Sequence, residues 1–185
     1  MPTHVALLRG INVGGVRVAM PALREVVASL GHTDVSTYIQ TGNVLFTARG
    51  SSTAKMSAAL RSALAEALGV KADVVVLSCG ELRQVATDNP YRDEPNPKYV
   101  HAVFLPDEAP PGAEARIAAA QQRAAERGSR DEAQLVGRTL FLHTPDGFGR
   151  SELATLLLGR SSSPVAGGTA RNWATVSKLL DLCGA

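Results

Sequence analysis

The sequence has few of the residues on which several common classes of protein depend. Its only cysteines are Cys79 and Cys183, too few for a disulfide framework and without C-x-x-C spacing. We therefore expect two buried, unreactive thiols and a reducing, cytoplasmic compartment. No stretch reaches the roughly 18 continuous apolar residues that span a bilayer. The start of the chain also lacks the pattern of a secretory signal, so we expect no membrane partner.

Strong charge and clustered metal ligands are missing as well. The formal net charge of +2 is too small for a protein that binds nucleic acid by charge alone. The four histidines show neither metal-ligand nor catalytic-triad spacing, and we expect no metal and no cofactor. By contrast, 45% of the 185 residues are hydrophobic, enough for a sizeable core. Because only 4% are aromatic, that core must consist mainly of Ala, Val and Leu.

Residues 1–78 have the pattern of a ferredoxin-like half. Their apolar spacing switches between the two-residue repeat of strands and the 3.6-residue repeat of helices. The resulting order is strand, helix, strand, strand, helix, strand, which is a split βαβ unit. These elements are expected near residues 4–8, 21–30, 35–40, 44–46, 52–68 and 73–77.

Residues 79–185 repeat these element types without a clear residue-level repeat. A capped short helix precedes a proline-rich loop at 89–98, and a two-residue turn at Gly137-Arg138 predicts a second hairpin. We expect a strand at 99–105, then helices at 113–127, 151–158 and 172–182. The sequence thus predicts an α+β fold of two ferredoxin-like (split βαβ) halves, 1–78 and 79–185. Each half is expected to consist of a mainly antiparallel sheet with helices packed on it, and the second half includes the C-terminal helix.

Three polar motifs interrupt this apolar pattern: RGINVGG at 9–15, TYIQTGN at 37–43 and TARNWATV at 169–176. In the first motif, Gly10, Gly14 and Gly15 allow backbone N–H groups to turn toward a bound anion, with charge from Arg9 and Arg17. A tight strand-to-helix connection explains the same glycines equally well.

The second and third motifs also leave two interpretations open. Gly42-Asn43 suits a hairpin turn, which leaves Tyr38 and Gln40 on one face without a local explanation. Arg171 lies beside the start of the last helix, where a guanidinium suits phosphate or carboxylate but equally an ion pair. Ser151 is interpreted as a helix N-cap in preference to a second phosphate contact.

These motifs, together with NPY at 89–91 and GRS at 149–151, occur in the order and spacing of one bacterial family. Over essentially its whole length the chain resembles the uncharacterised domain of unknown function 1697 family. The resemblance implies an α+β fold of two ferredoxin-like halves and implies no activity. Glu152 and Ala174 depart from the family pattern, in which Lys and Asn are usual, and Glu152 weakens a phosphate role for Ser151.

The leading hypothesis is a cleft between the halves that binds a phosphate-bearing ligand, either a nucleotide or an RNA segment. One alternative is an enzyme on a small phosphorylated or carboxylated substrate, with Tyr38 or Ser151 moving a proton. However, none of the three motifs supplies an ordinary general base. The other alternative is an interaction module whose motifs lock the halves together or form a dimer. The residues expected to line the ligand site are Arg9, Asn12, Gly14, Gly15, Tyr38, Asn43, Arg171 and Asn172.

Overall fold

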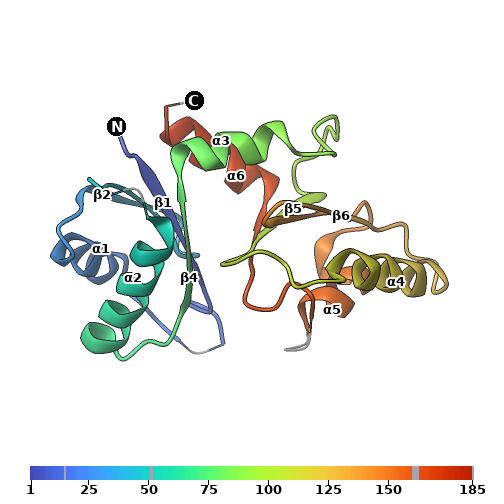
Figure 1. Cartoon of the computed structure of the whole chain (residues 1–185), viewed down its shortest axis with the longest axis horizontal. Coiled ribbons are helices and arrows are strands. Elements are labelled where there is room, and N and C mark those ends of the chain that lie inside the picture. Colours follow the sequence, from blue (N-terminus) through green and yellow to red (C-terminus); the bar gives the residue numbers. More distant parts are fainter. Residues whose placement is uncertain (15, 51, 160–162, 185) are drawn as a thin grey trace. The chain divides into compact units, whose positions relative to one another are not determined.

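The computed structural model describes residues 1–14, 16–50, 52–159 and 163–184 (Figure 1). The chain forms two compact units. The first unit comprises Met1–Gln84 together with Lys178–Ala185, and the second comprises Val85–Ser177. Each unit contains one four-stranded antiparallel sheet with helices, which confirms the α+β class expected from the sequence.

The first unit follows the predicted split βαβ order. Its sheet has the strand order β2-β3-β1-β4, so β1 and β3 are the central strands and β2 and β4 form the edges. The elements are β1 (His4–Arg9), α1 (Met20–Ser29), β2 (Thr33–Tyr38), β3 (Asn43–Thr47), α2 (Thr53–Leu68), β4 (Asp73–Ser78) and α3 (Cys79–Thr87).

The core of the first unit lies between its sheet and the helices α1 and α2. Ala6 and Leu8 of β1 pack against Leu23 of α1 and against Leu60 and Leu64 of α2. Helix α2 begins where the Ser52 hydroxyl accepts a hydrogen bond from the Lys55 N–H, and it ends at Gly69 with φ 64°. Local sequence signals therefore set both ends of this helix.

The second unit has the equivalent sheet, in the order β6-β7-β5-β8. Strand β5 is buried along its whole length, and Val103 packs with Ile117, Leu140 and Leu153 in the core. The elements are β5 (Val100–Phe104), α4 (Ala113–Ala125), β6 (Glu132–Val136), β7 (Thr139–His143), the 3-10 helix η1 (Phe148–Arg150), α5 (Glu152–Leu158), β8 (Thr169–Asn172) and α6 (Trp173–Leu182). The part of α6 from Lys178 onward belongs to the first unit, and the part of α3 from Val85 onward belongs to the second.

Strand β8 was not expected from the sequence. It pairs with β5 in the register Phe104↔Thr169 and His101↔Asn172. Four residues, of which three are polar or charged, carry too little hydrophobic alternation to indicate a strand. The third polar motif is thus an edge strand followed directly by α6, and not only a helix start.

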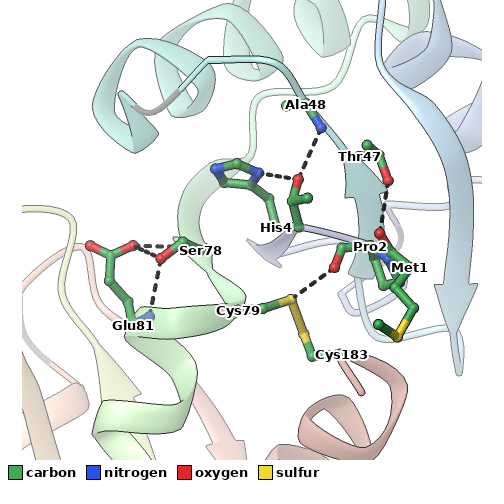
Figure 2. The surroundings of a disulfide bond; sticks show 10 residues. Met1, Pro2, His4, Thr47, Ala48, Ser78, Cys79, Glu81 and Cys183 are labelled. Carbon is green, nitrogen blue, oxygen red and sulfur yellow. Dashed lines mark hydrogen bonds between the residues drawn. A yellow bond between two sulfur atoms is a disulfide. The ribbon is translucent and has the colours of Figure 1, made fainter. Parts of the chain in front are cut away.

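The expectation of two free thiols was wrong, because Cys79 and Cys183 form a disulfide (Figure 2). Their Cα atoms lie 5.7 Å apart although the two residues are 104 positions apart in sequence. Cys79 is the first residue of α3, and its N–H donates to the Thr3 carbonyl at 2.8 Å. Tertiary folding brings the two residues together, and sequence spacing carries no trace of that approach.

Two outer strands of the sheets receive a hydrogen bond partner from a neighbouring helix. The Val76 N–H of β4 donates to the Ser57 hydroxyl of α2 at 3.0 Å. The Ala133 N–H of β6 donates to the Gln121 side-chain oxygen of α4 at 2.9 Å. Each bond satisfies a strand donor that the sheet itself leaves unpaired. In the described residues, no helix is both long enough and apolar enough to cross a membrane.

Candidate functional site

The first polar motif forms a loop whose backbone φ alternates in sign. Gly10, Asn12 and Gly14 have φ of 79°, 54° and 59°, whereas Ile11 and Val13 between them have negative φ. Such alternation turns successive N–H groups toward one side of the chain. We refer to residues 10–14 as the nest, because anion-binding backbone nests share this kind of alternation.

The N–H groups of this nest are available for a ligand. Within the described part of the chain, no N–H from Gly10 to Gly14 donates a hydrogen bond to a protein acceptor. Most of the segment is exposed, and only Ile11 is buried, at 3% exposure. Buried or half-buried donors normally find partners, so a run of unpaired N–H groups needs water or an anion.

Arginines flank the nest. Arg9 is the exposed last residue of β1 and directly precedes Gly10. Arg17 is exposed on the other side and lines a cavity of about 520 Å³ with Asn12, Gly14 and Gln40. Gly15, which was expected at the site, lies outside the described residues. Both guanidinium groups can add charge-assisted hydrogen bonds to an anion held by the backbone.

Asn12 holds this loop in place with its side-chain amide. The Asn12 Nδ2 donates to the Val18 carbonyl at 3.1 Å and to the Gln40 carbonyl at 2.8 Å. Its Oδ1 accepts from the Val18 N–H at 2.9 Å. Because both amide donors are used, Asn12 serves the site by positioning the backbone, and its left-handed φ suits asparagine.

The second polar motif adjoins the first. The Leu8 N–H donates to the Gly42 carbonyl at 2.8 Å. A Cβ at Gly42 would lie 2.8 Å from the Leu8 Cβ, and φ at this glycine is 81°. Gly42 therefore permits a close approach that no larger residue allows.

Asn43 and Tyr38 face one another across the β2–β3 ladder. Asn43 is fully buried, and its Nδ2 donates to the Tyr38 carbonyl and to the Thr41 hydroxyl, both at 3.1 Å. The asparagine thus braces the hairpin turn. Tyr38 is half-buried, so solvent reaches part of this residue whereas Asn43 is shielded.

Arg171 and Asn172 belong to the second unit, whereas the other expected site residues belong to the first. Arg171 is buried, and its guanidinium donates to the Thr169 hydroxyl and to the Ala170 carbonyl, both at 2.8 Å. Burial lowers its pKa to about 10. The Asn172 Oδ1 accepts from the Thr175 N–H at 2.9 Å and caps α6. Both side chains therefore have structural partners within their own unit.

Ser151 is the N-cap of α5, as interpreted from the sequence. Its hydroxyl accepts from the Ala154 N–H at 2.8 Å and donates to the buried Asp131 carboxylate at 2.8 Å. The neighbouring Glu152 forms an ion pair with Arg127. These contacts account for Ser151 and Glu152 without a ligand.

A second basic pocket that sequence reasoning missed opens beside the nest. It has a volume of about 370 Å³, and Arg9 and Gly10 form part of its wall. Arg61 of α2 and Lys71 before β4 add two exposed cations, and Asp73 adds one carboxylate. No sequence motif joins these residues, because they come from three separate elements.

The second unit holds a titratable cluster that was also missed. His143 Nε2 lies 2.7 Å from the Glu94 carboxylate, and the Tyr91 ring stacks on the imidazole at 5.3 Å. Hydrogen bonds from the Asn96 N–H and then from His143 lower the pKa of Glu94. Burial raises the pKa of Tyr91 to about 12. The cluster fastens the loop before β5 to strand β7.

Fold and site together define an α+β protein of two similar halves with a candidate anion nest in the first. The family model described as protein of unknown function (DUF1697) matches residues 1–141, and the chain belongs to that family. The third polar motif lies beyond the matched residues.

Among solved structures, the chain is similar to the conserved bacterial protein SP0830 from Streptococcus pneumoniae. The TM-score is 0.70 at 22% sequence identity, and the similarity covers 98% of each chain. This likeness shows a shared fold. No curated protein matches the sequence significantly.

Proposed function

We propose that this protein binds a phosphate-bearing ligand, a nucleotide or an RNA segment, at the nest of its first unit. The observation that supports this proposal most directly is the unpaired N–H run from Gly10 to Gly14. Alternating φ signs at these residues favour a common direction for several donors, and phosphate oxygens are acceptors well suited to such a set.

Charge around the nest favours the same ligand class. Arg9 and Arg17 stand on either side of the loop, and Arg61 and Lys71 line the adjoining pocket. Within the described chain, none of these four cations has an ion-pair partner. Their charges are therefore available to an anion, and a guanidinium can bind phosphate through two parallel hydrogen bonds.

Binding is favoured over catalysis by the residue types in the nest cavity. The side chains that line it are amide, aliphatic or guanidinium groups, from Asn12, Val13, Val16, Arg17, Val18, Ala19 and Gln40. None is a carboxylate, an imidazole or a thiol, which are the usual general bases and nucleophiles.

Calorimetric titration of inorganic phosphate, AMP and a short RNA tests the proposal. We expect binding to the wild-type protein and about tenfold weaker binding to Arg9→Ala and Arg17→Ala, since a hydrogen bond to a charged group contributes about 1.5 kcal/mol or more. Lys55→Ala is the matched control, because it removes an exposed cation from α2 outside both pockets. Melting temperatures establish that each variant is folded.

Amide NMR spectra give a residue-specific measurement of the same event. Phosphate held by the nest should move the backbone N–H signals of residues 10–14 downfield, and more than those of the hairpin in the second unit. Absence of binding at millimolar concentrations, or binding that leaves these signals in place, contradicts the proposal. Equal affinities of wild type, Arg9→Ala and Arg17→Ala contradict it as well.

A further inference from the structure

The basic pocket beside the nest contains one acidic side chain that a plain phosphate site does not need. Arg9 and Asp73 are opposite residues in the β1–β4 ladder, and both line the pocket. Opposite residues have Cβ atoms about 5 Å apart. Nevertheless no ion pair joins Asp73 to Arg9, Arg61 or Lys71 in the described residues. The carboxylate therefore remains an open acceptor among three cations.

A carboxylate in this position weakens the binding of a bare phosphate, because like charges repel. It strengthens the binding of a ligand that also carries hydroxyl groups, because an ionised carboxylate can only accept hydrogen bonds. Acidic side chains bind ribose hydroxyls in this way in dinucleotide sites. The pocket residues thus suit a ligand with both phosphate and vicinal hydroxyls.

We propose, on the basis of the proposed function, that the ligand is a ribose phosphate whose sugar hydroxyls donate to Asp73. Its phosphate lies on the nest, and the sugar enters the neighbouring pocket past Arg9 and Gly10, which line that pocket at the start of the nest loop. Arg61 and Lys71 balance the Asp73 charge and contact further phosphate oxygens.

The size of the pocket is compatible with this ligand. Its volume of about 370 Å³ is at the lower end of the range for small-molecule sites, about 300 to 1,000 Å³. Charged side chains of Arg9, Arg61, Lys71 and Asp73 line the pocket together with Gly10, Ala65 and Ala72. A sugar with an attached phosphate therefore fits better than an extended apolar ligand. Either a free nucleotide or an RNA strand can present this chemistry.

The test compares the affinity of AMP with that of its 2′,3′-dideoxy counterpart. Wild-type protein should bind AMP about tenfold more tightly, because a hydroxyl bond to a carboxylate contributes about 1.5 kcal/mol. Asp73→Asn should reduce this ratio several-fold and bind inorganic phosphate more tightly than wild type. Glu66→Gln removes an exposed carboxylate from α2 outside the pocket and should leave the ratio unchanged.

A second set of titrations distinguishes the two sources of ribose phosphate. A short RNA is compared with DNA of the same sequence and with AMP at equal ionic strength. RNA binding more tightly than both supports an RNA segment, and AMP binding as tightly as RNA supports a free nucleotide.

The inference and the proposed function fail in distinguishable ways. Equal affinity for AMP and its dideoxy counterpart, with both affinities lowered by Arg9→Ala, overturns the ribose assignment and leaves the phosphate site intact. An unchanged AMP preference in Asp73→Asn also overturns the assignment. Absence of binding of every phosphate compound to the wild-type protein overturns both proposals.

Discussion

The side-chain amide of Asn12 bridges to the backbone of Gln40, with Nδ2 and the carbonyl oxygen 2.8 Å apart. This contact ties the nest loop to the turn between β2 and β3, two segments 28 residues apart in sequence. Because the N–H groups from Gly10 to Gly14 donate no hydrogen bond within the described residues, the conformation of this loop depends strongly on such outside contacts.

Asn12→Ala should therefore destabilise the protein as well as weaken ligand binding. The change removes three hydrogen bonds and places alanine at φ 54°, and we expect a loss of about 2 kcal/mol. Urea unfolding measures the loss. Asn12→Gly keeps the backbone conformation accessible, so it separates the hydrogen bonds from the strain. An Asn12→Ala protein as stable as wild type contradicts the bracing role.

Gly42→Ala should be more damaging than an ordinary glycine substitution. The new Cβ would meet the Leu8 Cβ at 2.8 Å in addition to the cost of φ at 81°. Gly31→Ala is a matched control, since φ there is 84° and no atom lies within 4 Å of an added Cβ. We expect about 1 kcal/mol for Gly31→Ala and at least about 3 kcal/mol for Gly42→Ala in urea unfolding. Similar losses at both positions contradict the packing argument.

Reduction of the disulfide should lower the free energy of unfolding. The bond closes a long loop, since Cys79 and Cys183 are 104 positions apart in sequence, and the chain-entropy model gives about 4 to 5 kcal/mol for such a loop. Chemical denaturation with and without a dithiol reductant measures the effect. The Cys79→Ser, Cys183→Ser double variant should have the same free energy of unfolding as the reduced protein, and the reductant should not change it. Equal stability of the oxidised and reduced protein contradicts this prediction.

His101 should make stability depend on pH in the acid range. Burial lowers its pKa from 6.5 to about 4, so between these values the unfolded chain binds the proton and the folded chain does not. The free energy of unfolding should therefore fall as the pH drops through this window. Burial lowers the pKa of His4 and His32 too, and these add to the same trend.

His101→Phe isolates the contribution of this residue. The imidazole stacks on Phe148 with ring centroids 4.0 Å apart, and its buried Nδ1 has no hydrogen bond partner among the described residues. A phenyl ring keeps the stacking and removes the titrating group. We expect a shallower pH dependence of the melting temperature between about pH 6.5 and 4 in the variant. A slope identical to that of wild type contradicts the assignment.

Much of the fold follows from local signals in the sequence. The apolar stripe of α2 ends at Gly69, and the turn at Gly137-Arg138 joins β6 to β7, both as predicted. Strand β8 and the Cys79–Cys183 bond could not be predicted in the same way. Partners distant in sequence determine both, and a single sequence does not identify those partners.

The candidate site was predictable only in part for the same reason. Three glycines within six residues indicated a loop suited to anions, and Gly10 and Gly14 do have positive φ. The positioning role of Asn12 depends on Gln40 and Val18, which only the folded chain brings within reach. No sequence motif marks Arg61 and Lys71 as site residues, because exposed cations on a helix or just before a strand are common on protein surfaces.

The side-chain hydrogen bonds at two outer strands affect how readily another chain can pair with the edges of the sheets. Ser57 occupies a donor of β4, and Gln121 occupies a donor of β6. An incoming chain that sought to extend either sheet would first have to displace an internal partner. We therefore expect β4 and β6 to pair with a strand of another molecule less readily than an edge strand without such a partner.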